Sequence, residues 1–160
     1  EKGVGTTFIT EIPLKLDPAA SDAEKSEEEI DTTVFRGLHV LLVEDNEVNM
    51  EIAAFLLEDS GAEVTKAWNG AEGLEKFNAS APGTYDLILM DIMMPVMDGL
   101  EAVQRIRALD RPDAKTVPII AMTANAFSED VERSRKAGMT EHLSKPLNAE
   151  TLKKAILRNI

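Results

Sequence analysis

The chain has 160 residues, of which 44% are hydrophobic and 4% aromatic, and its formal net charge at pH 7 is −12. This length suits one compact domain with a tail, and the negative charge argues against nucleic acid or an anionic membrane surface as a partner. The sequence has no cysteine, which excludes disulfides, thiolate catalysis and thiolate zinc sites. Its apolar runs are too short to cross a bilayer, so we expect a cytoplasmic fragment without membrane contact, whose parent protein can be membrane-anchored.

Residues 1–36 differ in composition from the rest of the chain. Within residues 1–17, the stretch GVGTTFITEIPLKLD alternates apolar and polar residues, which predicts one strand. Residues 18–36 are acidic and nearly free of large apolar side chains, so they are interpreted as a flexible linker. The segment GVGTT could suggest a phosphate-binding loop, but the Gly-Lys-Ser/Thr ending is missing, and a turn before a strand is favoured. Because the chain begins with Glu1, we expect it to be part of a longer protein.

Residues 37–160 alternate between strand and helix patterns and are expected to form one domain. Short apolar runs predict strands at 39–43, 63–68, 85–90, 117–122 and 140–144. Apolar residues at helical spacing predict helices at 47–59, 70–79, 98–109, 128–138 and 148–160. This alternation implies parallel strands joined by right-handed crossovers. We therefore predict an α/β fold with a flavodoxin-like, doubly wound (βα)5 parallel sheet in the strand order 2-1-3-4-5.

Three further expectations concern residues within and at the start of the predicted helices. The apolar stripe of the first helix is identified as Val48, Ile52, Phe55 and Leu56. Gly73 interrupts the second helix, at a cost of about 1 kcal/mol relative to alanine, and the sequence offers no functional reason for it. The helix at 148–160 is expected to start with Asn148 as its cap.

Polar side chains stand at the ends of four of the predicted strands. The strand ends are Glu44-Asp45, Asp91, Thr123-Ala124 and Ser144-Lys145-Pro146. The carboxyl ends of parallel strands meet at one edge of a sheet, where functional groups collect. Each residue alone has an ordinary explanation as a helix cap, turn residue or surface lysine, but the joint pattern favours one functional cleft.

The residue types in this cleft predict phosphoryl chemistry on magnesium. Carboxylates packed together repel one another and demand a cation, and Mg²⁺ prefers oxygen ligands. Asp45 and Asp91 are expected to bind it directly, Glu44 through water, and Met93 through its backbone carbonyl. Lys145 and Thr123 supply a positive charge and a hydroxyl for phosphoryl oxygens, and Asp91 becomes the nucleophile of a phosphoryl transfer.

Residues 38–160 resemble the receiver domain of two-component response regulators, in the motifs VEDNEVN, MDIMMPVMDG, AMTANA and LSKPL. The resemblance implies that Asp91 accepts a phosphoryl group from a phosphohistidine and that Mg²⁺ is held by Glu44, Asp45 and Asp91. It also implies that Thr123, with Ala124, and Lys145 bind the phosphate, and that the peptide bond before Pro146 is cis. The expected output is a change of the face formed by the fourth helix, the fifth strand and the fifth helix.

The start of the chain resembles the last Gly-rich turn and strand of a histidine-kinase ATP-binding domain, in the stretch KGVGTTFITEIPLKLD. This resemblance implies that the chain comes from the C-terminal part of a hybrid sensor histidine kinase, without the kinase's catalytic core. The expected partner is a histidine phosphotransfer protein or the phosphohistidine domain of the kinase, and the fragment itself is expected to be a monomer or weak dimer.

Three questions remain open from the sequence. His142 stands where the family often has an aromatic switch residue, and it is either such a switch or a plain edge-strand residue. A haloacid-dehalogenase-type phosphatase also uses Asp, Thr, Lys and Mg²⁺, but it requires a second Asp two positions after the nucleophile, where this chain has Met93. A degenerate receiver that acts only as a docking module is the other alternative, and the complete acidic set argues against it.

Overall fold

A computed structural model of the chain describes residues 34–124 and 128–160. The strand expected within residues 1–17 and most of the linker expected at 18–36 lie outside these residues. The end of that linker does not behave as one, because Phe35 is 2% exposed and its backbone N–H donates to the carbonyl of Ser60 over 2.9 Å. The folded domain therefore begins earlier than residue 37.

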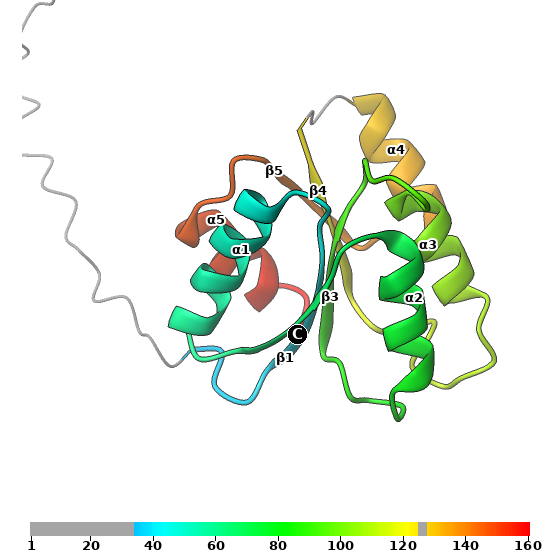
Figure 1. Ribbon diagram of the computed structural model, residues 1–160, viewed down its shortest axis with the longest axis horizontal. Helices are drawn as coiled ribbons and strands as arrows, with labels where there is room; N and C mark the ends of the chain where they lie inside the picture. Colours follow the sequence, from blue (N-terminus) through cyan, green and yellow to red (C-terminus); the bar gives the residue numbers. More distant parts are fainter. Residues whose placement is uncertain (1–33, 125–127) are drawn as a thin grey trace, which may run out of the picture. The chain divides into compact units, whose positions relative to one another are not determined.

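The described residues form five strands and five helices in strict alternation (Figure 1). The strands are β1 (His39–Val43), β2 (Glu63–Ala67), β3 (Leu87–Asp91), β4 (Ile119–Thr123) and β5 (Glu141–Ser144). The helices are α1 (Glu47–Asp59), α2 (Gly70–Ala79), α3 (Gly99–Arg107), α4 (Ser128–Ala137) and α5 (Ala149–Leu157). None of the helices within the described residues is long and apolar enough to cross a membrane.

The strands form one parallel sheet in the order β2-β1-β3-β4-β5. In the register, Val43 lies opposite Met90, Asp91 opposite Met122, and Thr123 opposite Ser144. The last residues of β1, β3, β4 and β5 are thus nearly level with one another. The predicted fold class and strand order are confirmed.

Two layers of helices cover the sheet (Figure 1). Side chains of a strand point alternately to the two faces, and β1 shows the division clearly. Leu41 and Val43 join the core that includes residues of α2 and α3, whereas Val40 and Leu42 join the core that includes residues of α1 and α5. Both faces of the central strands are buried, which explains their nearly continuous apolar sequences.

The apolar stripe identified on α1 does not face the core. Val48, Ile52 and Phe55 are 66%, 46% and 65% exposed, and only Leu56 of the predicted set packs partly against the core. The residues that α1 buries are Met50, Ala53, Ala54 and Leu57. The helix carries two apolar faces, and the face with two alanines can approach the sheet most closely. The other face is left on the surface.

Side chains at the helix starts fix where four helices begin. Asn46, Asn69, Asp98 and Asn148 each accept a hydrogen bond from a backbone N–H three residues later. Such caps satisfy donors that a helix start leaves without a partner. The cap predicted at Asn148 is confirmed, and the cap at Asn46 places the start of α1 directly after the acidic pair Glu44-Asp45.

Two glycines allow helices to lie close to the strands that carry functional residues. A Cβ atom on Gly99 would lie 2.0 Å from the backbone oxygen of Asp91, and one on Gly73 would lie 2.9 Å from Cγ2 of Val43. Real Cβ atoms do not approach so closely. Gly73 is therefore explained by the close packing of α2 against Val43, the residue before Glu44.

Near the amino ends of β3 and β4, an arginine of the α3–β4 loop forms an ion pair within that loop and reaches the end of α2. The guanidinium of Arg111 contacts Asp113 at 2.6 and 2.8 Å and donates to the backbone oxygens of Phe77, Ser80 and Ala81. It also lies 4.2 Å from the centroid of the Phe77 ring. These contacts, called here the Arg111 clasp, bind the α3–β4 loop to the end of α2.

Candidate functional site

The predicted site residues meet at the carboxyl edge of the sheet. Glu44 follows β1, Asp91 ends β3, Thr123 ends β4 and Lys145 follows β5. The parallel register brings these four strand ends to one level, although they are separated by up to 101 positions in the sequence (145 − 44). The convergence predicted from the strand ends is therefore observed.

Three carboxylates form the floor and rim of the site. Oxygens of Glu44, Asp45 and Asp91 all lie within 4.8 Å of one another. Glu44 is 1% exposed and Asp91 5% exposed, whereas Asp45 is exposed to solvent. We call this cluster of three residues the acidic pit. Burying carboxylates together is costly unless a positive charge balances them.

Lys145 provides one balancing charge. Its Nζ atom lies 2.5 Å from Oε2 of Glu44 and 2.7 Å from Oδ2 of Asp91. The lysine is positioned by its backbone N–H, which donates to the carbonyl of Thr123 over 2.8 Å, and the following peptide bond to Pro146 is cis, as expected. One ammonium group thus bridges two of the three carboxylates.

The electrostatics of the site follow from burial and from these contacts. Burial raises the pKa of Glu44, and hydrogen bonds from Lys145 and Asn49 oppose this rise only in part. Burial alone would lower the pKa of Lys145, but hydrogen bonds to Asp91 and Glu44 outweigh it and raise the pKa. The lysine is therefore held in its charged form, and the ionised form of Glu44 is disfavoured by its surroundings.

Hydrogen bonds from the first turn of α1 and from the β3–α3 loop orient the acids. Asn49 Nδ2 donates to Oε1 of Glu44 over 3.1 Å, and the backbone N–H of Asn46 reaches the same oxygen at 3.4 Å. The backbone N–H of Met93 donates to Oδ1 of Asp91 over 3.2 Å. The part played by Asn49 was not predicted from the sequence. Its spacing of five residues from Glu44 across a helix start was the only available signal.

Beside the acidic pit lies a hollow of about 370 Å³. Its lining residues are Ile92, Met93, Asp98, Leu100, Thr123, Ala124 and Arg133. Thr123 is 6% exposed and Ala124 is exposed, so the end of β4 forms one wall of a space that opens next to Asp91. Met93 is 78% exposed, lines the hollow and donates its backbone N–H to Asp91.

His142 lies on β5 and is partly buried. Its Nε2 atom makes a hydrogen bond with the hydroxyl of Ser134, a fully buried residue of α4. Burial lowers the pKa of His142, and the charge of Glu141 opposes this only in part. The ring thus connects β5 to α4 and does not belong to the acidic pit.

The donor set of the acidic pit fits a hard dication. Three carboxylates stand against the single ammonium of Lys145, and all of the ligand atoms are oxygens. Asp45 is the exposed member, so the pit is open to solvent on its side. Carboxylate oxygens with room for waters are the environment that Mg²⁺ selects.

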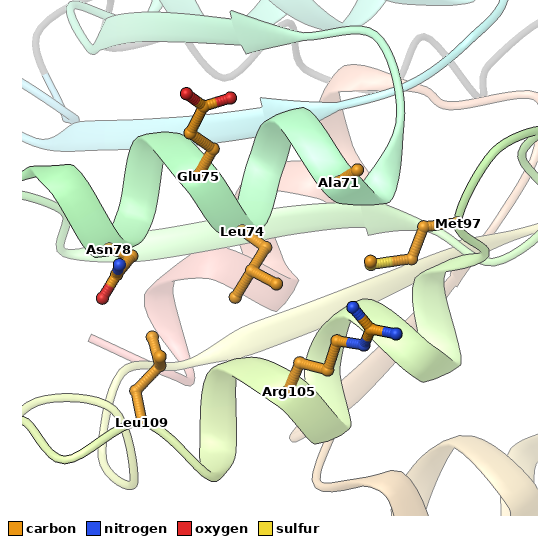
Figure 2. A pocket seen from close by; sticks show the side chains of 7 residues that line it. All are labelled: Ala71, Leu74, Glu75, Asn78, Met97, Arg105 and Leu109. Atoms are coloured by element: carbon orange, nitrogen blue, oxygen red, sulfur yellow. The ribbon is translucent and has the colours of Figure 1, made fainter.

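A second hollow, of about 400 Å³, lies between α2 and α3 (Figure 2). Leu74 of α2 points toward α3, and Arg105 reaches from α3 toward α2. Ala71, Met97 and Leu109 add apolar side chains to the lining, Glu75 and Asn78 add polar ones, and none of the acidic-pit residues takes part in it. This hollow is therefore separate from the candidate functional site at the strand ends.

Comparison with known proteins agrees with this geometry. Residues 40–157 match the family described as the response regulator receiver domain. The chain is 38% identical over 135 residues to the hybrid signal transduction histidine kinase L of Dictyostelium discoideum, covering 84% of this chain and 8% of that protein. It is 44% identical over 115 residues to two-component system protein A of Emericella nidulans, covering 71% and 16%.

A solved structure shows the same fold. The receiver domain of a sensor histidine kinase from Pseudomonas aeruginosa PAO1, which has a magnesium ion coordinated in its active-site cleft, is 38% identical, with a TM-score of 0.69. The similarity covers 77% of this chain and 97% of that domain. The two curated relatives are much longer than the chain, which spans only 8% and 16% of their lengths. The chain belongs to the response regulator receiver domain family of two-component phosphorelay systems, as its motifs indicated.

Proposed function

We propose that this receiver domain takes a phosphoryl group from a phosphohistidine onto Asp91 with Mg²⁺ bound in the acidic pit. The observation that carries the proposal is the meeting of Asp91 with Glu44, Asp45 and Lys145 within hydrogen-bonding and metal-binding distances. A buried aspartate at the end of a strand is costly. Here its surroundings match the needs of a nucleophile in phosphoryl transfer.

The reaction forms one bond and breaks one. A carboxylate oxygen of Asp91 bonds to phosphorus, and the bond from phosphorus to the donor's imidazole nitrogen breaks, with its electron pair going to that nitrogen. Bound Mg²⁺ would supply positive charge for the phosphoryl oxygens, held by Asp45, Asp91 and the Met93 carbonyl, with Glu44 acting through water. Lys145, already 2.7 Å from Asp91, pairs with a phosphoryl oxygen, and Thr123 with Ala124 contacts another.

The donor must be a protein or domain that can bring its imidazole to Asp91. In-line transfer needs the reacting atoms about 3 to 3.5 Å apart, so the donor has to contact the rim of the pit. The exposed apolar face of α1, formed by Val48, Ile52 and Phe55, begins three residues after Asp45 and is a suitable docking surface. A histidine phosphotransfer protein or the phosphohistidine domain of a kinase is the partner that we propose.

The proposed output is a change of the face formed by α4, β5 and α5. Thr123 is followed by the loop that leads into α4, and His142 of β5 makes its hydrogen bond with Ser134 of α4. A shift of Thr123 toward the phosphoryl group would be transmitted to α4 and then to the His142 contact. In this proposal His142 acts as the switch residue, and the output is contact with another protein.

The parent protein is proposed to be a hybrid histidine kinase. The chain would then contain the last strand of the ATP-binding domain within residues 1–17, a linker that ends before Val34, and the receiver domain. The fragment would promote its own phosphorylation and dephosphorylation and work as a monomer or weak dimer. The relatives that are themselves hybrid histidine kinases support this assignment.

Intact mass after incubation with Mg²⁺ and acetyl phosphate tests the proposal. We expect one added phosphoryl group on the wild type, and none on Asp91→Asn or when the metal is chelated. Asp98→Asn is the matched control, because Asp98 lies in the same loop and asparagine still caps α3. A folded wild type without addition would favour the docking-only alternative. Repeated turnover of phosphomonoesters would favour the phosphatase.

A further inference from the structure

The Glu44 carboxylate is enclosed, with a different hydrogen-bond donor for each of its oxygens. Its side chain is 1% exposed. Oε2 faces Nζ of Lys145 at 2.5 Å, and Oε1 accepts from Nδ2 of Asn49 over 3.1 Å. The backbone N–H of Asn46 adds a longer contact to Oε1, at 3.4 Å. The two side-chain donors thus hold different oxygens of the carboxylate.

The two donors differ in charge and in the number of carboxylates that they contact. Lys145 carries a full charge and shares its ammonium with Asp91, 2.7 Å away. Asn49 is neutral and sits in the first turn of α1, where its backbone N–H donates to the capping oxygen of Asn46 over 3.0 Å. Its neighbour Met50 is completely buried, which anchors this turn against the sheet. Asn49 is therefore presented to Glu44 by a fixed element.

We propose that Asn49 is a positioning residue that fixes the orientation of Glu44 for metal binding. This inference rests on the proposed function, in which Lys145 moves its ammonium toward a phosphoryl oxygen. Glu44 then loses its donor at Oε2, and Asn49 keeps Oε1 in place, so that Oε2 still faces the acidic pit. A residue that orients a metal ligand in this way contributes to metal affinity without touching the metal.

An amide suits this position better than a charged side chain. A lysine or arginine at position 49 would neutralise part of the negative charge that attracts the cation. An aspartate would place a fourth carboxylate beside Glu44 and could not donate. The neutral amide satisfies one oxygen of a buried carboxylate and leaves the charge of the pit unchanged.

Calorimetric titration of the purified chain with Mg²⁺ tests the role of Asn49. We expect Asn49→Leu and Asn49→Ala to bind Mg²⁺ about tenfold more weakly than the wild type, at the lower end of the range for residues that orient metal ligands. Asn78→Ala is the control, because it makes the same substitution at an exposed position of α2, away from the acidic pit. Its affinity should remain within about twofold. Circular dichroism checks that each variant is folded.

A double-mutant cycle distinguishes positioning from a general structural effect. If Asn49 acts through Glu44, Asn49→Ala should lower Mg²⁺ affinity in the wild type but have no further effect in a Glu44→Ala background. Equal losses in both backgrounds, or wild-type affinity in both Asn49 variants, would overturn the inference. Failure of the proposed function looks different, because a wild type that binds Mg²⁺ but gains no phosphoryl group contradicts only that function.

Discussion

The two edges of the sheet both carry clustered charges, but they are balanced in opposite ways. At the amino edge, the Arg111 clasp pairs one cation with one carboxylate and three backbone carbonyls. At the carboxyl edge, three carboxylates of the acidic pit share the ammonium of Lys145. The first cluster is satisfied within the protein, whereas the second keeps an excess of negative charge.

This difference separates a stabilising cluster from a functional one. The surroundings of Asp113 lower its pKa to about 2, chiefly through the hydrogen bond from Arg111, so folding favours its ionised form. Burial instead raises the pKa of Glu44, so folding disfavours its charge. The charge of Glu44 is thus disfavoured at a place where the donor set fits a cation.

The largest expected effect comes from breaking the clasp. Arg111→Met leaves Asp113 and the carbonyls of Phe77, Ser80 and Ala81 without their guanidinium, and should lower the free energy of unfolding by about 3 kcal/mol. Urea denaturation measures this loss. Arg105→Met is the control, since Arg105 is exposed and pairs with Glu101 on its own helix, a contact worth less than about 0.5 kcal/mol. Equal losses in both variants would contradict the contrast between the two edges.

The next effect concerns the packing behind the acidic pit. Gly73→Ala should lower the free energy of unfolding by about 1 to 2 kcal/mol, because the new methyl group would collide with Val43. An open position in a helix would instead gain about 1 kcal/mol. Asn78→Ala, at an exposed position of the same helix, should show no such loss in thermal or urea unfolding. A stabilised Gly73→Ala variant would show that α2 does not approach β1 so closely.

A pH dependence distinguishes the clasp from an ordinary surface pair. The pKa of Asp113 is lowered from 3.8 to about 2, so its contribution to stability is complete above the unfolded value and is lost as the pH falls through about 2. The difference in free energy of unfolding between the wild type and Asp113→Asn should therefore shrink by about 1 to 2 kcal/mol as the pH falls from about 5 to about 2. A difference that stays constant with pH would show that the charge of Asp113 is unimportant.

The smallest expected effect is at the acidic pit itself. In metal-free buffer, Asp91→Asn removes one of three neighbouring negative charges and still offers an oxygen to Lys145. Its free energy of unfolding should be unchanged or higher by up to about 1 kcal/mol. Addition of Mg²⁺ should stabilise the wild type more than this variant, because only binding to the native state adds stability. A large loss of stability without metal would show that Asp91 is structural.

The sequence was sufficient for the features that depend on local patterns. The apolar runs and helical spacing located the strands and helices, and the strand ends identified Glu44, Asp45, Asp91, Thr123 and Lys145 as neighbours. The prediction of the site succeeded because the carboxyl ends of parallel strands lie along one edge of the sheet. Asn148 was predicted as a cap from its residue type and its place directly before a helical pattern.

The features that were missed depend on contacts between distant segments. Both faces of α1 have helical spacing, so the pattern alone could not show that Ala53 and Ala54 face the sheet while Val48 and Phe55 do not. Gly73 makes sense only beside Val43, thirty positions earlier (73 − 43). Arg111 binds carbonyl groups about thirty positions away, which carry no side-chain signal at all.

Site mapping of the phosphorylated residue tests the central claim most directly. The chain is incubated with Mg²⁺ and a phosphohistidine-bearing phosphotransfer protein and then reduced with borohydride, which converts an aspartyl phosphate to homoserine. Peptide mass spectrometry then locates the change. We expect homoserine at position 91 and nowhere else, and none when the metal is chelated. Stable phosphate on another residue, or an unchanged position 91 in a protein that has received the phosphoryl group, would contradict the account.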